Sequence, residues 1–385
     1  MELSGYRRPD GRVGFRNHVL VLPTVACANG VVAAICRKVP EAVMLPMDSG
    51  CGMLREDQIV FARTLTNLAG NPNVAAILCV GLGCEAFKPE QAKAAIERFG
   101  KPVEAITMHS AGGYAATVEK GTRIARELIS AASHVLREPV AVSDLILGLN
   151  CGASDPASGL TANQALGAAV DLLVDAGGSA VIGETTECVG AEEEMASNAV
   201  SPQVAQRILD TVHRFEHHVK MYGADLSTGE PNQGNMEAGL TTLEEKSLGC
   251  IRKIGSRPIV DVIEYADIPD KKGPILMDSP SYDAPSVTGI VAGGAQVVVF
   301  TTGLGTPFGM SIVPVIKVMS NTPAFQRMED TADLNAGTIL DGKETIAETG
   351  RRLYDLVLEV ANGRTTKAEE LGENQCQIWR TTLTL

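Results

Sequence analysis

The sequence predicts an α/β protein with two domains, each built on a parallel sheet covered by helices. Apolar runs of strand length alternate with segments of helical periodicity, which is typical of parallel strands buried on both faces. The chain of 385 residues is also too long for one simple core. Because aromatic residues make up only 4% of the sequence and glycine occurs 39 times, aliphatic side chains must form the core and glycines must shape many loops.

The first predicted domain comprises residues 1–140 and the second residues 141–385. The strands expected in the first are Val19–Val25, Ala42–Met47, Val74–Gly81 and Val103–Met108, with helices at Asn29–Val39, Arg55–Ala69, Pro89–Phe99 and Ala115–Val135. The strands expected in the second are Leu145–Leu149, Ala180–Gly183, Pro274–Met277 and Val297–Thr301, with helices at Val204–Met221 and Glu344–Val360. Residues 222–240 are rich in turn formers and predict an extended functional loop.

Charge and composition exclude several classes of partner. The net charge of −13 disfavours nucleic acid and anionic membranes. No apolar run reaches the roughly 20 residues of a membrane span, and the N-terminus lacks an apolar signal core, so we expect a cytoplasmic protein. The nine cysteines are odd in number and include no C-x-x-C pair, which disfavours disulfides and zinc ribbons.

Four cysteines follow predicted strands. Cys27, Cys51, Cys84 and Cys151 each come directly after an apolar run, and the last three have glycine neighbours. Ligands gather beyond the carboxyl ends of parallel strands, so these cysteines predict a shared site between the two domains. The alternative is that each packs as a small buried apolar residue.

Basic residues supply candidates for substrate binding and for the base. Arg16 and Asn17 suit recognition of a carboxylate, although Arg16 could equally form an ion pair between domains. Lys246 and Lys317 are candidate bases because desolvation lowers the pKa of a lysine. A helix-surface position is the alternative for Lys246.

Acidic and hydroxyl residues also follow strands. Glu184 and Glu187, in G-E-T-T-E, are candidate acids or metal ligands. Ser154 and Asp155 either bind substrate or cap the following helix.

A Gly/Thr loop and one histidine complete the candidates. Thr301, Thr302 and Gly303 follow a strand and could bind an anion through backbone N–H groups. The loop lacks the lysine of a Walker motif, which disfavours nucleotide binding. His109, after another strand, is a candidate for proton transfer.

Ordered motifs along nearly the whole chain resemble the large catalytic part of the altronate/galactarate dehydratase family, which includes the large subunit of sulfolactate sulfo-lyase. The matching blocks are Gly5–Asn17, Pro23–Cys27, Gly50–Cys51, Gly81–Glu85, Cys151–Asp155, Ser158–Asn163, Gly183–Glu187, Gly234–Asn235, Gly239–Gly249, Phe300–Pro307 and Val313–Lys317. The resemblance implies a lyase that removes a group β to a carboxylate. The dehydratases release water from sugar acids and leave a 2-keto-3-deoxy acid, whereas the sulfo-lyase releases sulfite.

The resemblance also implies iron, a separately encoded small subunit and an oligomer. It marks Cys51, Cys84, Cys151, Glu85 and Cys27 as candidate metal ligands. Thiolates would suit an iron–sulfur cluster with one open iron position. A single Fe²⁺ or Mn²⁺ held by cysteine and carboxylate groups is the rival interpretation. Asn235, in the Gly234–Asn235 block, is a candidate for binding the hydroxy-acid substrate.

Individual positions favour different members of the family. In the sulfo-lyase branch the counterparts of Cys51 and Cys84 are not cysteine, so their presence here favours the dehydratases. Asp48 and Leu304 stand where the sugar-acid dehydratases carry His and Arg. We therefore expect a hydro-lyase acting on a hydroxy or sugar acid. A carbon–sulfur lyase subunit and a non-catalytic ligand- or metal-binding subunit are the alternatives.

Overall fold

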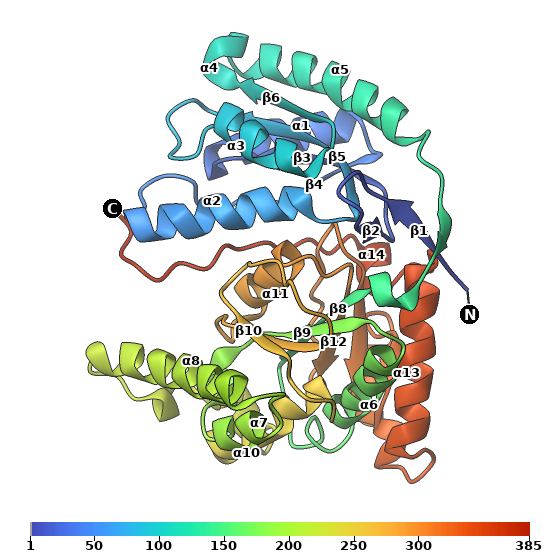
Figure 1. The fold of residues 1–385 in the computed structure, drawn as a ribbon. Coiled ribbons are helices and arrows are strands. Elements are labelled where there is room, and N and C mark those ends of the chain that lie inside the picture. The colour runs from blue at the N-terminus through green and yellow to red at the C-terminus, as the bar shows by residue number, and fades with distance from the viewer. Residues whose placement is uncertain (1) are drawn as a thin grey trace.

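The computed structural model describes residues 2–385 and contains two parallel sheets (Figure 1). The first has the order β4-β3-β5-β6, with β3 His18–Pro23, β4 Ala42–Met44, β5 Val74–Gly81 and β6 Val103–Thr107. The second has the order β10-β11-β9-β8-β12-β13-β14, with β8 Ile146–Gly152, β9 Ser179–Ile182, β10 Asp261–Ile263, β11 Pro274–Met277, β12 Val297–Thr302, β13 Val315–Met319 and β14 Leu334–Asn335. The predicted α/β class with parallel sheets is confirmed.

Alternation along the strands explains how helices cover both faces of the first sheet. In β3, Val19 and Val21 face α1 (Asn29–Lys38) and α5 (Tyr114–Ala132), whereas Leu20 and Leu22 face the opposite side. The helices on that opposite side are α2 (Arg55–Gly70) and α3 (Pro89–Ile96). Apolar side chains are therefore required at successive positions, which is why the strand is a continuous apolar run.

The second sheet follows the same rule and shares a core with the first. Val297 and Val299 of β12 face α6 (Ala162–Asp175) and α13 (Ile346–Ala361). Val298 and Phe300 join the core that contains α2 and α11 (Asp283–Ala292). Figure 1 shows α2 above α11, with the C-terminal segment running between the two units.

Several elements were not predicted from apolar runs. A small antiparallel sheet, β2-β1-β7, joins β1 (Leu3–Arg7) and β2 (Val13–Gly14) to β7 (Glu138–Val140), at the division that we propose near residue 140. The helix predicted at Val204–Met221 is α8 Pro202–Met221. The helices that were not predicted are α4 Met108–Ala111, α7 Glu192–Ser197, α9 Gln233–Glu237, α10 Leu243–Cys250, α12 Thr322–Arg327 and α14 Lys367–Leu371. Within residues 2–385, none of the helices combines the length and apolarity of a membrane span.

Two buried asparagines tie the units together. Asn71 Nδ2 donates to two backbone carbonyls at and just after the end of α11, at 2.8 Å each. Asn73 Nδ2 donates to the carbonyls of Gln296 and Ile312, and its Oδ1 accepts from the amide of Phe15 at 2.8 Å. Both asparagines are fully buried, so their amides replace water at the junction.

We expect Asn73→Ala to lower the free energy of unfolding by about 3 kcal/mol, because buried carbonyl and amide groups would lose their partners. Gln203→Ala, at an exposed position of α8, is the control and should change it by less than about 0.5 kcal/mol. Urea denaturation measures both. An Asn73→Ala effect as small as that of the control would contradict the role given to this amide.

Candidate functional site

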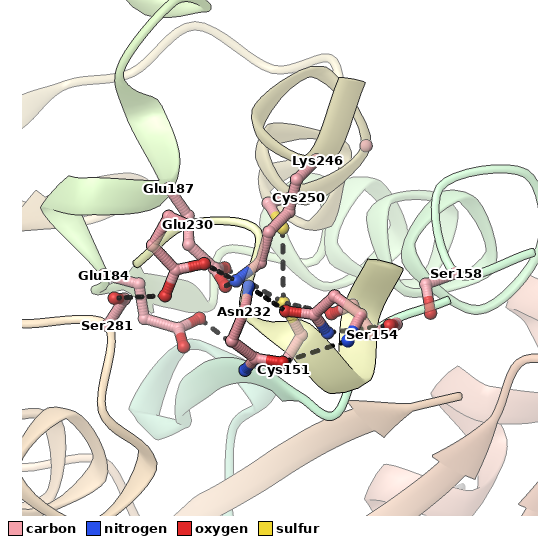
Figure 2. Close-up of polar contacts among 12 residues, drawn as sticks. Cys151, Ser154, Ser158, Glu184, Glu187, Glu230, Asn232, Lys246, Cys250 and Ser281 are labelled. Atoms are coloured by element: carbon pink, nitrogen blue, oxygen red, sulfur yellow. Dashed lines mark hydrogen bonds and ion pairs between the residues drawn. The ribbon is translucent and has the colours of Figure 1, made fainter. Parts of the chain in front are cut away.

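Two thiols and a carboxylate meet at the carboxyl ends of neighbouring strands. Cys151 lies near the end of β8, and Glu187 lies in the 3-10 turn Thr185–Cys188 that follows β9. Cys250 ends α10 and completes the group. Cys151 Sγ lies 3.1 Å from Glu187 Oε2 and 3.4 Å from Cys250 Sγ, and all three side chains are buried (Figure 2). One ligand atom from each lies within 4.8 Å of the others, so the group could hold a metal ion.

A buried ammonium anchors the same group. Lys253, in the 3-10 turn Ile251–Ile254 after α10, has a side chain only 1% exposed. Its Nζ donates to Glu184 Oε2 at 2.6 Å and to Cys151 Sγ at 2.9 Å, and lies 3.4 Å from Glu187 Oε2. Cys151, Glu184, Glu187, Cys250 and Lys253 are called the Cys151 cluster below.

Burial and pairing set the charge of each member. Burial and the charge of Glu187 raise the pKa of Glu184 well above its usual range, which favours the neutral acid. For Glu187 burial acts in the same direction, but Lys246 and Lys253 outweigh it and lower the pKa to about 2. The hydrogen bond with Cys250 lowers the pKa of Cys151, and the Lys253 ammonium acts in the same direction against burial, which favours the thiolate.

Backbone strain coincides with this site. Ala153 and Glu184, which follow β8 and β9, have positive φ values of 49° and 68°. Such conformations are costly for residues other than glycine and concentrate at functional sites. Among the described residues, Glu184 Oε1 is also buried without a hydrogen-bond partner. The local structure therefore holds one carboxyl oxygen free inside the cluster.

A pocket opens beside the cluster. Its volume is about 370 Å³, within the range of small-ligand sites, and Ser154, Lys246 and Cys250 are among the residues that line it. Lys246 Nζ lies 3.2 Å from Glu187 Oε1 and also binds Glu230. Burial lowers the pKa of Lys246, but the two carboxylates outweigh it and raise the pKa. This pairing favours a cation rather than a base at this position.

A further acid stands at the edge of the site. Asp283, at the start of α11, accepts a 3.4 Å hydrogen bond from Asn150 Nδ2 and lies beside Gly152 of β8. Burial, together with the charge of Glu187, raises its pKa to about 7. A carboxyl group with this pKa can take or give a proton near neutral pH.

The other strand-end candidates of the second unit lie on the same edge of the sheet but have structural partners. The Asp155 carboxylate accepts from Ser158, Ser320 and Asn321, and so holds the turn that precedes α6. A Cβ on Gly303 would come within 2.6 Å of Asp155, so only glycine fits there.

The threonines and asparagine have clear partners as well. Thr301 Oγ1 donates to Asn163 at 2.6 Å, and Thr302 Oγ1 accepts backbone N–H groups of the following loop at 3.0 and 3.2 Å. Asn235 Nδ2 donates to the carbonyl of Ser154 at 2.8 Å and so fastens α9 to the wall of the pocket.

Cys27, Cys51 and Cys84 are exposed in three loops at the carboxyl edge of the first sheet. Hydrogen bonds join these loops, since the amide of Ala26 donates to Ser49 O and that of Ala86 to Gly50 O. Glu85 is buried and accepts from Thr24 Oγ1 at 3.1 Å and from the amide of Gly83 at 2.6 Å. Within residues 2–385, the metal-ligand group with Cys151 includes none of these cysteines.

The remaining candidates lie outside the Cys151 cluster. Arg16 makes a bidentate pair with Glu369 of α14, which is the ion-pair alternative considered for it, and Asn17 Nδ2 donates to the carbonyl of Ala132. Lys317 Nζ donates to the carbonyl of Phe308, and burial lowers its pKa to about 8. His109 lies on α4, with its ring against Gly83 in the Cys84 loop.

Sequence reasoning missed Cys250, Lys253, Glu230 and Asp283. The first two could have been found from spacing, because Lys246, Cys250 and Lys253 are four and three residues apart, which is the spacing of one helix face. In the structure α10 ends at Cys250 and Lys253 follows in a 3-10 turn. No local pattern indicates Glu230 or Asp283, which come from other segments.

Residues 142–384 match the family model described as D-galactarate/Altronate dehydratase, C-terminal, and residues 5–133 match D-galactarate dehydratase/Altronate hydrolase, second domain. The chain belongs to this family. It is 37% identical to (2R)-sulfolactate sulfo-lyase subunit beta of Chromohalobacter salexigens, over 98% of this chain and 96% of that protein. It is 36% identical to galactarate dehydratase (L-threo-forming) of Escherichia coli, over 94% and 73%. It is 32% identical to altronate dehydratase of Bacillus subtilis, over 99% and 78%.

We expect Lys253→Met to lower the free energy of unfolding by about 3–5 kcal/mol, because buried anions would lose their counter-charge. The control is Lys343→Met, which removes an exposed pair with Asp341 and should cost about 1 kcal/mol or less. Chemical denaturation compares the two variants. Equal effects would mean that Lys253 does not balance the cluster.

Asp283 generates a prediction about pH. One pKa unit is worth about 1.4 kcal/mol, so a rise from 3.8 to about 7 on folding removes about 4 kcal/mol of stability as the pH rises from 4 to 8. Stability falls as the pH rises because the unfolded chain releases the Asp283 proton at a lower pH than the folded protein does. Asp283→Asn should therefore gain up to about 4 kcal/mol relative to the wild type over this range. Denaturation at several pH values tests this, and Asp330→Asn, at an exposed position, is the matched control.

Proposed function

We propose that this chain is a lyase that eliminates water from a small hydroxy acid at the Cys151 cluster. The observation that carries the proposal is a buried group of two thiols and two carboxyl groups, which is paired with Lys246 and Lys253. This group lies beside a pocket large enough for a small acid. Family membership supports it, since relatives at 32–37% identity are named as dehydratases or as a sulfo-lyase subunit.

Elimination needs a base for the α-proton, positive charge near the enediolate and an acid for the departing hydroxyl. We assign the carboxylate contact to Lys246, which lines the pocket. Asp283 is the base, because its pKa of about 7 lets it accept a proton at neutral pH. Glu184 is the acid, because its environment favours the protonated form and its Oε1 has no other partner among the described residues.

Cys151, Glu187 and Cys250 fit a metal ion by ligand type, since two sulfurs and one carboxylate oxygen suit Fe²⁺ and similar divalent ions. A bound ion would act as a Lewis acid toward substrate oxygens. We propose a single ion, with iron as the first candidate, because this group brings together two thiols rather than the three thiolates considered for a cluster. The loops of Cys51 and Cys84 remain a second proposed ligand set.

A carbon–sulfur lyase is the second candidate function. The similarity to the sulfo-lyase subunit extends over 96% of that protein, and exposed Leu304 stands where the resemblance leads us to expect Arg in the sugar-acid enzymes. The relative's name denotes a subunit, and we propose a separately encoded small partner here as well.

Turnover of galactarate, altronate and sulfolactate by the anaerobically purified protein, with its partner subunit if one is found, separates the candidates. Formation of a 2-keto acid without sulfite supports the hydro-lyase. Stoichiometric sulfite overturns it in favour of the carbon–sulfur lyase. Tight metal or acid binding without turnover of any of the three acids supports a non-catalytic subunit instead.

We expect Cys250→Ser to lower both bound iron and turnover by at least about tenfold, the loss typical when groups that hold or orient a metal are changed. Cys84→Ser tests the other ligand set, and half-buried Cys36→Ser is the matched control. Metal analysis of the three purified variants gives the answer without an activity assay. Full iron in Cys250→Ser and loss in Cys84→Ser would move the metal site to the first sheet.

A further inference from the structure

Glu230 reaches Lys246, a residue of the pocket wall, from a segment that is mostly exposed. Residues 222–240 leave the body after α8 and return before α10. In this segment only Pro231, Asn235 and Leu240 are buried, and the Glu230 side chain is 19% exposed. Figure 2 shows the Glu230 carboxylate directed toward the Lys246 ammonium.

The contact gives one ammonium two carboxylates. Lys246 pairs with Glu187 and with Glu230, and Glu187 also faces Lys253. Within residues 2–385, the Glu230 carboxylate has one further polar contact, a long one of 3.5 Å with Ser281 Oγ. Glu187 is fixed inside the Cys151 cluster, whereas Glu230 is carried by an exposed segment. Of the two carboxylates, Glu230 is therefore the one that can leave.

A carboxylic acid that enters the pocket meets two cations in its wall, Lys246 and Arg252. Arg252 is 42% exposed and pairs with Glu194, whereas the Lys246 side chain is only 6% exposed and contacts Glu187 of the Cys151 cluster, so Lys246 is the cation that would hold the acid at the cluster. A buried ammonium is stable only while it is paired, so one carboxylate can replace another at small cost, whereas simple departure of Glu230 is unfavourable. Glu230 therefore competes with an incoming acid and leaves when the acid arrives.

We propose that Glu230 is an internal stand-in for the substrate carboxylate: it occupies Lys246 in the ligand-free protein, and an entering acid displaces it together with the neighbouring part of the 222–240 segment. This inference rests on the proposed function, because it takes a carboxylic acid as the ligand. It makes Glu230 a specificity-determining residue. A ligand without a carboxylate cannot replace it on Lys246.

Asn235 fixes the limit of the movement. Its amide donates to the carbonyl of Ser154, and Asn232 and Asn235 bond each other's backbone amides at the start of α9. These bonds do not involve Glu230. The segment before α9 can therefore move while α9 stays on the wall of the pocket.

Glu230→Gln removes the competing charge and keeps the shape of the side chain. We expect the KM for the acid substrate to fall about tenfold. This is the change expected if Glu230 leaves Lys246 free in only about one wild-type molecule in ten. Exposed Glu237→Gln, on the same segment, is the matched control and should leave KM unchanged. A large fall in kcat at constant KM would instead mark Glu230 as a proton-transfer residue, and a rise in KM would mark it as a binding residue. Either result overturns the inference.

Hydrogen exchange provides a readout that needs no turnover. Adding galactarate, altronate or sulfolactate to the wild type should speed amide exchange in residues 222–230, and Glu230→Gln should exchange rapidly there without any acid. Unchanged or slower exchange in the wild type on acid binding would contradict displacement.

Calorimetric binding of the same three acids to both proteins separates this inference from the proposed reaction. Turnover with equal KM in wild type and Glu230→Gln overturns the Glu230 inference alone. Tighter binding to Glu230→Gln without turnover overturns the reaction alone. Absence of acid binding to both proteins overturns both.

Discussion

The second unit depends on the burial of one ammonium. Lys253 is almost completely enclosed, and an unpaired charge at that depth would be strongly unfavourable. Its partners come from three places in the chain: Cys151 at the end of β8, Glu184 just after β9 and Glu187 one turn later. The turn that carries Lys253 must therefore lie against both strand ends, which also brings Cys250 onto Cys151. The candidate metal group and the buried ion pair are consequences of one constraint.

A chain of ion pairs of alternating charge runs from Lys253 to the exposed 222–240 segment. Lys253 pairs with Glu187, Glu187 with Lys246, and Lys246 with Glu230. Each charged group neutralises a neighbour whose burial as an unpaired charge would be unfavourable. A change at one end of the chain of pairs therefore alters the charge balance at the other. This continuity connects the exposed 222–240 segment to the strand ends.

Apolar runs and strand-end residues allowed the parallel sheets, Cys151 and the Glu184–Glu187 turn to be predicted, because each strand is buried on both faces and its end is local in sequence. Cys250, Lys253 and Glu230 arrive from α10 and its flanking segments, and no periodicity states which strand a helix will face. The pairing of Arg16 shows the same limit: a motif can identify a residue of importance while its partner, Glu369, lies 353 positions away.

The charge count connects metal and substrate. Glu187 and Glu230 already neutralise the Lys246 and Lys253 ammonium groups in the ligand-free site, and the lowered pKa of Cys151 favours a thiolate that adds negative charge. An acid added to this arrangement meets repulsion unless Glu230 leaves or a cation binds. A divalent ion on Cys151, Glu187 and Cys250 would add positive charge to this arrangement. Metal binding and acid binding at this site should therefore favour each other, even though Glu230 contacts only the ammonium of Lys246.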